Sequence, residues 1–246
     1  MTRPFWVSET AEAFWAAAGK PGSPPRDLRT AILCTLPVAI VLLPRLRVGA
    51  VDDWLRQRGV ACSAGAGDRT LRAGLVARDG HGFLFLDGGD PDDEQRFSLA
   101  HELAHFLRDY WQPRQRVAER LGAAALEVLD GVRPPEPAEQ IHALLARTDL
   151  SYQVHLMDRS LDGGYRSAAT ERSERAADQL AYELLAPEAE IRGALGSSVP
   201  EERRARGADL LSVDYGLPPR HAARYAEVLF PPPAVGPLLR RLRDFS

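Results

Sequence analysis

Apolar residues recur at helical spacing in the stretch from residue 91 to residue 107, which predicts a strongly amphipathic helix. The residues of its apolar stripe are Leu99, Ala100, Leu103, Phe106 and Leu107. Asp90 is a typical N-cap residue, and Pro91 suits the first helical position. Acidic residues follow in the first turn, where the helix dipole stabilises negative charge. This pattern predicts a helix that buries one face in a core.

The pattern upstream of this helix predicts a small sheet. Two apolar runs between residues 70 and 89 flank Asp79-Gly80-His81-Gly82, a turn signal that indicates a β-hairpin. The apolar run 31–43 is broken by Pro37 and is too short to span a membrane, so it predicts a buried helix end followed by a strand. Helices are also expected at residues 5–18 and 48–60. The fold class predicted is therefore α+β, mostly helical, with a small sheet or hairpin preceding the amphipathic helix.

The amphipathic helix contains an H-E-x-x-H motif, made by His101, Glu102 and His105. Residues i and i+4 lie on one helical face, so both imidazoles can reach a single ion. Glu102 lies about 100° further round the helix, as suits a general base that is not itself a ligand. The motif predicts a zinc-dependent hydrolase. Ordinary histidines on the surface or in the core of an amphipathic helix are the alternative.

A zinc hydrolase of this type needs a third protein ligand. Downstream, Glu174 and Asp178 are four residues apart on a second predicted helix. Glu174 is our candidate for the third ligand, and Asp178 can accept the free ring N–H of a ligand histidine. Glu171 competes for the third position because it lies nearly one turn earlier. A solvated acidic pair beside nearby arginines is the other interpretation.

Residues 95–110 and 171–187, with the runs RFSLAHELAHFL and ERAADQLAYELLAP, resemble the ImmA/IrrE family of metallo-endopeptidases. The resemblance implies a minimal zincin in which His101, His105 and Glu174 bind the metal and Glu102 is the catalytic glutamate. Asp178 stands where the family more often has Asn, and Leu180 where it often has Phe. Neither departure removes a ligand.

Three segments are expected along the chain: an N-terminal helix and linker at 1–25, a zinc metallopeptidase domain at 26–187, and a C-terminal helical segment at 188–246 that packs on the core. The long separation of His105 from Glu174 predicts an insertion at 112–165 within the middle segment. That insertion either shapes access to the catalytic cleft or adds a packing layer without a chemical role.

Zincins commonly need a further donor that stabilises the oxyanion developing on the scissile carbonyl. Tyr152, His155, Tyr165 and Arg166 all precede the third-ligand helix. Among them we name His155 and Tyr165 as candidate catalytic residues, with simple packing as the alternative. The other histidines, His81, His142 and His221, are expected to be ordinary surface or cap residues.

Composition narrows the class of protein. The 246 residues carry a net charge of −3, which argues against a nucleic-acid binder that relies on bulk positive potential. Two cysteines, Cys34 and Cys62, lie outside any paired motif, as is typical of a reduced cytoplasmic protein. No signal peptide or membrane anchor is expected.

Two other functions compete with the peptidase interpretation. The C-terminal run 201–230 predicts two short helices broken near Gly216, which resembles a helix-turn-helix with Arg220, His221 and Arg224 on its recognition face. Against this, Tyr225, Val228 and Leu229 need burial. A catalytically inactive protein that keeps zinc for structure is the other alternative, although a structural site needs a fourth ligand and the sequence offers none.

We therefore expect a cytoplasmic zinc metallo-endopeptidase with one Zn²⁺ per chain, Mn²⁺ or Fe²⁺ being possible in a His/His/Glu site. The resemblance implies that its substrate is a protein, a helix-turn-helix transcriptional repressor whose cleavage releases target genes under stress. Direct binding to nucleic acid or to a membrane is not expected. The sequence does not predict an oligomeric state.

Overall fold

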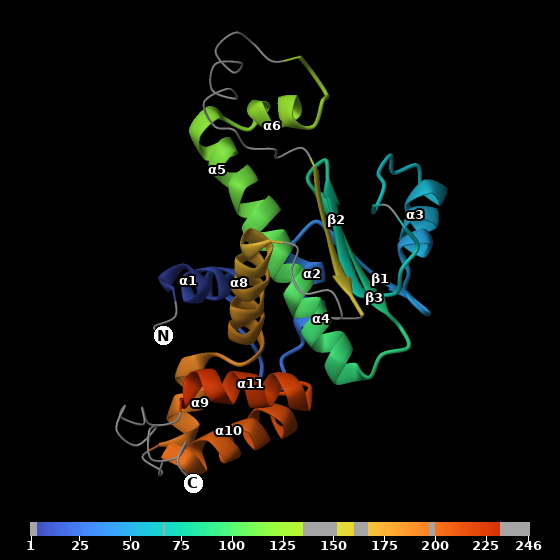
Figure 1. The fold of residues 1–246 in the computed structure, drawn as a ribbon. Coiled ribbons are helices and arrows are strands. Elements are labelled where there is room, and N and C mark those ends of the chain that lie inside the picture. Colours follow the sequence, from blue (N-terminus) through green and yellow to red (C-terminus); the bar gives the residue numbers. More distant parts are fainter. Residues whose placement is uncertain (1–3, 66, 135–151, 160–166, 197–199, 232–246) are drawn as a thin grey trace.

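A mixed four-stranded sheet forms the middle layer of the protein, in a computed structural model that describes residues 4–65, 67–134, 152–159, 167–196 and 200–231 (Figure 1). The strands are β1 (Val38–Leu43), β2 (Leu71–Arg78), β3 (His81–Asp87) and β4 (Tyr152–Asp158). Their order is β1-β3-β2-β4; β1 runs parallel to β3, and β2 runs antiparallel to both of its neighbours. Because helices make up most of the remaining structure, the predicted α+β class is confirmed.

Helices cover both faces of this sheet and divide the core in two. The helix α3 (Val48–Gln57) packs on one face, where Leu55 is buried and Trp54 lies edge-on to Phe83 and Phe85. On the other face lies the larger cluster, which includes α4 (Asp92–His105) and α8 (Ala168–Leu185) (Figure 1). The sheet therefore holds α4 in place by direct packing, and α8 packs against α4 from the far side.

The predicted hairpin is confirmed, with a tighter turn than the sequence suggested. Asp79 and Gly80 both have positive φ, at 50° and 79°, as a two-residue turn of type I′ requires. His81 and Gly82 already belong to β3, where Gly82 pairs with Val38 of β1. The run 31–43 also folds as expected, into the end of α2 (Leu28–Thr35) and then β1.

The strand β4 was not predicted, and it changes the account of residues 112–165. It pairs antiparallel to β2, so the outer side of the hairpin is covered and β4 is the edge of the sheet. Its residues 154 and 156 pack toward the α3 side, whereas Met157 packs against the larger cluster. The segment expected to be an insertion therefore supplies part of the central sheet.

A single helical rod crosses the molecule and changes its winding in the middle. It consists of α4, then η1 (Phe106–Trp111), which is a π-helix, and then α5 (Gln112–Leu121). Pro91 is its N-cap rather than its first helical residue, and the predicted apolar stripe is buried throughout. A short helix α6 (Ala124–Leu129) follows the rod. The buried Arg114 of α5 donates two hydrogen bonds, of 2.7 and 2.8 Å, to Asp130 at the C-terminal end of α6.

The terminal helices pack on the same core. The helix α1 (Phe5–Ala17) lies against α8, where the Trp15 indole donates a hydrogen bond to the Leu184 carbonyl at 3.1 Å. The C-terminal helices are α9 (Glu188–Leu195), α10 (Pro200–Val213) and α11 (Pro219–Leu229). Tyr225 and Leu229 of α11 are buried as expected, but Val228 is 56% exposed because it lies on the outer side of that helix. No helix among the described residues has the length and apolar composition that crossing a membrane requires.

At Gly82 the sheet and the helical rod approach each other closely. A Cβ atom there would lie 2.7 Å from Cε2 of Phe106 and 3.1 Å from a methyl group of Val38. We expect Gly82→Ala to lower the free energy of unfolding by about 1–3 kcal/mol, because the added methyl group overpacks the core. Urea denaturation measures this difference.

The matched control is Gly193→Ala on α9, where an added Cβ meets no atom within 4 Å. Alanine is the better helix former, so this variant should gain about 0.5–1 kcal/mol. Equal stability of Gly82→Ala and the wild type would show that the sheet and the rod are not tightly packed at this point.

Candidate metal centre

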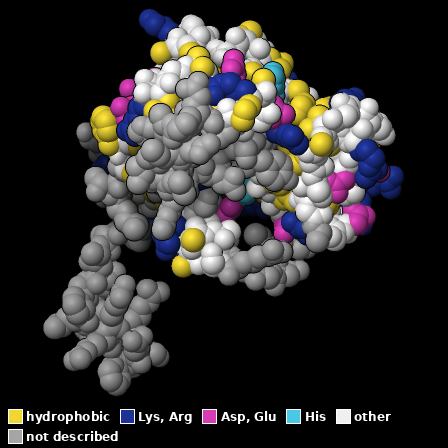
Figure 2. All heavy atoms as spheres, turned by 90° about the horizontal axis from the view of Figure 1, so that it is seen from above, with side chains coloured by type: hydrophobic (Ala, Val, Ile, Leu, Met, Phe, Trp, Pro, Cys, Tyr) yellow, Lys and Arg dark blue, Asp and Glu magenta, His cyan; other side chains and the backbone are white. Residues whose placement is uncertain are grey.

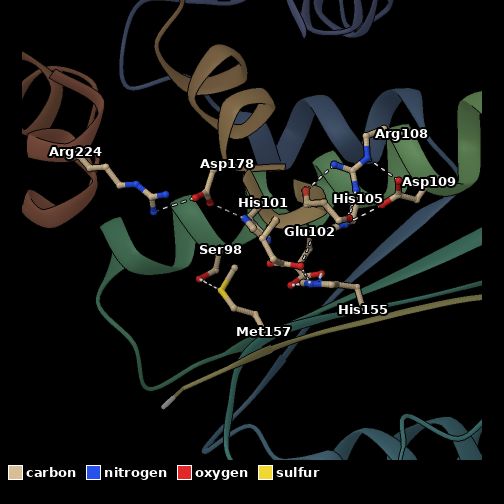
Figure 3. A network of polar contacts seen from close by, with 12 residues as sticks. Ser98, His101, Glu102, His105, Arg108, Asp109, His155, Met157, Asp178 and Arg224 are labelled. Carbon is tan, nitrogen blue, oxygen red and sulfur yellow. Dashed lines mark hydrogen bonds and ion pairs between the residues drawn. The ribbon is translucent and has the colours of Figure 1, made fainter. Parts of the chain in front are cut away.

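Three elements bring polar side chains to one buried point between the sheet and α8 (Figure 3). The helix α4 supplies His101, Glu102 and His105, whose exposed fractions are 2%, 0% and 2%. The helix α8 supplies Glu174, and β4 supplies His155. Charged or polar groups that are buried this deeply require partners.

Four of these side chains form a group fit to hold a metal ion: His101, His105, His155 and Glu174, with one ligand atom from each and all such atoms within 4.8 Å of one another. The Nε2 atoms of His101 and His105 lie 3.3 and 3.7 Å from the Glu174 carboxylate oxygens. Within the described part of the chain, neither Nε2 atom has a hydrogen-bond partner. Two buried, unpartnered imidazole nitrogens beside a carboxylate are the donor set that a tetrahedral Zn²⁺ site needs, so the residues fit the metal.

The other ring nitrogens of the two helix histidines explain why the Nε2 atoms are free. His101 Nδ1 lies 3.1 Å from Asp178 Oδ1, and His105 Nδ1 lies 2.9 Å from Asp109 Oδ2. A carboxylate accepts, so in each case the proton is on Nδ1 and the lone pair is on Nε2. Both rings are thus held in the tautomer that binds metal through Nε2.

Each of these two carboxylates is itself paired with an arginine. Arg224 Nη1 of α11 lies 3.1 Å from Asp178 Oδ2. Arg108 donates two hydrogen bonds of 2.6 Å to Asp109. The Arg108 guanidinium also bonds to the backbone carbonyl and the hydroxyl of Ser173, at 2.8 and 2.6 Å, and so ties η1 to the residue before Glu174.

Burial and neighbouring charges set the protonation of the metal-binding groups. Burial, reinforced by the nearby His155, lowers the pKa of His105 to about 4, which leaves that ring neutral at neutral pH. Burial opposes the charge on His101 as well, but the facing carboxylates of Asp178 and Glu174 outweigh it and raise its pKa. Burial works against ionisation of Glu174, yet the adjacent His101 and His155 lower its pKa, so this carboxylate is ionised.

His155 lies between the two glutamates. Its Nδ1 is 2.9 and 3.2 Å from the two Glu102 oxygens, and its Nε2 is 3.0 Å from Glu174 Oε1. Burial alone would disfavour a charged ring, but the two carboxylates outweigh it and raise the pKa of His155 to about 10. Unlike His101 and His105, His155 therefore has a hydrogen-bond partner on each ring nitrogen.

The structure separates the candidates that the sequence left open. Glu171 is directed away from the cluster and pairs with Arg175 at 2.6 Å, whereas Glu174 lies within the cluster and Asp178 beside it. No fourth potential ligand was evident in the sequence, but β4 brings a ring nitrogen of His155 among the other potential ligand atoms. Tyr165 and Arg166 lie outside the described residues.

Sequence reasoning missed three residues of this site: Asp109, Arg108 and Arg224. Asp109 carried a usable signal, since it continues the four-residue spacing of His101 and His105 along one helical face. Arg224 carried no such signal, because it is far from the motif in sequence and its contact depends on how α11 packs.

The side chains proposed for a DNA-recognition face turn toward the rest of the chain. Arg220 pairs with Glu94 at 2.7 Å, and Arg224 pairs with Asp178. As expected, His221 is not among the potential metal ligands; it is half-buried in the first turn of α11 and stacks on Phe97 with ring centroids 3.5 Å apart. Burial, together with the nearby Arg220 and Arg224, lowers the His221 pKa to about 3. On the face that Figure 2 shows, basic and acidic side chains are interspersed rather than gathered by sign.

Comparison with known proteins supports the metallopeptidase interpretation. Residues 60–127 match the model of the IrrE N-terminal-like domain, the M78 family of peptidases. The match covers the hairpin, α4, η1 and α5 and ends before β4 and α8, so His155 and Glu174 are located by the structure. No curated protein and no solved structure matches the chain. Residues 60–127 are thus similar to a metallopeptidase domain of this family, and the structure adds a His/Glu group fit for a metal ion.

The geometry predicts which side chains hold the metal. Purified protein should bind about one Zn²⁺ per chain, and His101→Ala, His105→Ala and Glu174→Ala should each abolish stoichiometric binding, because each removes one of three ligands. Metal content is measured by elemental analysis after gel filtration.

Glu171→Ala is the matched control, since it removes a carboxylate from the same helix without touching the cluster. It should keep its zinc. Zinc retained at full stoichiometry in Glu174→Ala would contradict the assignment of the third ligand.

Proposed function

We propose that this chain is a cytoplasmic zinc-dependent endopeptidase that cleaves a protein substrate, with Glu102 as the general base. The observation that carries the proposal is the pair of buried, unpartnered Nε2 atoms of His101 and His105, which face Glu174 beside a completely buried glutamate. His101, His105 and Glu174 would hold the ion. A divalent metal bound there polarises the scissile carbonyl and lowers the pKa of water.

Glu102 is suited to proton transfer rather than to ligation. It is the only member of the H-E-x-x-H motif outside the group of potential ligands, and its carboxylate is turned toward His155. Glu102 accepts a proton from the attacking water, whose oxygen bonds to the carbonyl carbon. It then donates that proton to the amine nitrogen as the carbon–nitrogen bond breaks, so one water is consumed for each bond cleaved.

His155 is suited to stabilise charge on the carbonyl oxygen. With a proton on each ring nitrogen, it can hold Glu102 through Nδ1. Its Nε2–H, which here bonds to Glu174, would be released when Glu174 binds the ion and could then donate to the oxygen on which negative charge develops. Its hydrogen bond to Glu174 supports this assignment over a fourth ligand, because a ligand nitrogen needs a free lone pair. Tyr165 remains a candidate for the same role by its place in the sequence.

The edge of β4 is suited to hold an extended peptide. Among the described residues, β4 pairs with β2 alone, so the backbone N–H and C=O groups on its other side are available to an added strand. His155 belongs to this strand, midway along it, and faces α4. A peptide pairing with β4 would therefore pass the cluster with a carbonyl within reach of His155.

By its resemblance to the ImmA/IrrE family, the substrate would be a helix-turn-helix transcriptional repressor, and its cleavage would couple a stress signal to gene expression. The alternative, an inactive metal-containing protein that binds DNA, is less well supported because Arg220 and Arg224 are engaged within the chain. Incubation with candidate repressors, followed by mass spectrometry of the fragments, tests the substrate class.

Replacing the general base separates catalysis from metal binding. Glu102→Gln should keep the metal and the fold, because Gln has the same shape and Glu102 is not a ligand. It should lower kcat for peptide cleavage by at least about a hundredfold, since no group remains to accept the proton. Cleavage at the wild-type rate by Glu102→Gln with full zinc content would rule out this role.

A second substitution tests whether His155 binds the carbonyl oxygen or the metal. His155→Gln should keep one zinc per chain and lower kcat by about a hundredfold, with little change in KM, as loss of an oxyanion donor does. Loss of zinc from this variant would instead make His155 a fourth ligand and favour a closed, structural site.

A further inference from the structure

The two helix histidines are oriented by the same kind of arrangement, built from different parts of the chain. For His105, the carboxylate is Asp109 and the arginine is Arg108, both on the same helical rod. For His101, the carboxylate is Asp178 on α8 and the arginine is Arg224 on α11. Figure 3 shows Arg224 reaching Asp178 from the C-terminal helices, on the side away from β4. One half of the metal site is therefore completed by residues outside the segment that matches the peptidase model.

We propose that Arg224 is a positioning residue for metal binding: its guanidinium fixes the Asp178 carboxylate, which in turn holds the His101 ring with Nε2 directed at the ion. The inference rests on the proposed metal site, but not on peptide cleavage. It assigns a function to α11 that is neither DNA recognition nor packing alone.

The geometry supports a specific role for the guanidinium. Asp178 uses Oδ1 for His101 at 3.1 Å and Oδ2 for Arg224 at 3.1 Å, so both oxygens of one carboxylate are engaged. A carboxylate held at both oxygens cannot rotate about its last bond without losing a partner. Asp178 is buried, so a broken contact is not easily replaced by water.

Contacts other than this ion pair also hold α11 in place. The Tyr225 ring stacks on Tyr182 of α8 with centroids 4.4 Å apart, and the Tyr225 hydroxyl donates to the Ala186 carbonyl at 3.2 Å. His221 stacks on Phe97 of α4 in addition. Removing the Arg224 guanidinium should therefore leave the helix docked and the protein folded.

Arg220 provides a matched control on the same helix. It lies one turn before Arg224 and is 46% exposed, compared with 52% for Arg224. It also forms one ion pair with α4, to Glu94 at 2.7 Å, but Glu94 is not a member of the group of potential metal ligands. Substituting either arginine removes one charge and one ion pair from α11, and only Arg224 is linked to a metal-binding histidine.

The experiment measures the dissociation constant for Zn²⁺ by competition with a chromogenic chelator, in the full-length chain. Methionine has an apolar chain similar to the stem of arginine, but it has neither the positive charge nor the N–H donors. We expect Arg224→Met to raise the dissociation constant by about three- to tenfold, below the ten- to hundredfold typical of a group that contacts the ligand directly, because Arg224 is half exposed. Arg220→Met should change it by less than about twofold, and Arg224→Lys should restore part of the loss.

A double-mutant cycle tests whether the effect passes through Asp178. In an Asp178→Asn background, the carboxylate that Arg224 holds is gone, so adding Arg224→Met should change zinc affinity by less than about twofold. Urea denaturation of the zinc-depleted variants checks that Arg224→Met and Arg220→Met are folded to the same extent.

Three outcomes overturn the inference: equal losses in affinity for Arg224→Met and Arg220→Met, a loss that persists undiminished in the Asp178→Asn background, or unchanged zinc affinity in Arg224→Met. Failure of the proposed function looks different. In that case the wild-type chain itself would bind no stoichiometric zinc, or would bind zinc and cleave no peptide.

Discussion

The structure depends on two buried imidazole nitrogens, Nε2 of His101 and Nε2 of His105, for which no described residue provides a hydrogen bond. His101 and His105 are almost fully enclosed, and their Nε2 atoms face the ionised carboxylate of Glu174 without a hydrogen bond. Leaving such groups unpaired in a core costs free energy, and a cation bound by them would offset that cost. Metal binding is therefore expected to stabilise the fold, because the ligands come from separate elements.

This constraint explains why α4 lies between two layers. Its apolar stripe packs on the sheet, while its polar face meets α8, which supplies both Glu174 and Asp178. The sheet in turn supplies His155 through β4. The sheet thus contributes an imidazole and α8 contributes carboxylates. A displacement of the sheet or of α8 relative to α4 would change the distances between the potential metal ligands. The Arg108 contacts with Asp109 and Ser173 resist such a displacement between the rod and α8.

Local patterns predicted the parts of the site that lie on one helix. The spacing of His101 and His105 placed both rings on one face, and the pairing of Glu174 with Asp178 identified the segment that the structure brings to them. The hairpin was predicted because Asp79-Gly80 is a turn signal that needs no tertiary context. β4 was missed although residues 152–156 alternate between apolar and polar, because the run was interpreted as part of an insertion and its pairing with β2 is a long-range contact that no local pattern carries. Arg224 depends on the docking of α11, and no periodicity carries that information.

The π-helix η1 has a consequence for how the helical rod is built. Each π-turn contains more residues than an α-turn, so the chain that leaves η1 is out of phase with an uninterrupted helix, by roughly 100° for each residue added. This phase shift lets one continuous rod present His101 and His105 to the cluster and, further along, Arg114 to Asp130. Deleting a single residue from η1 would keep the rod helical yet rotate α5 about its axis. The number of residues in η1, more than the identity of its side chains, therefore determines which face of α5 points to α6 when α4 presents its histidines to the metal site.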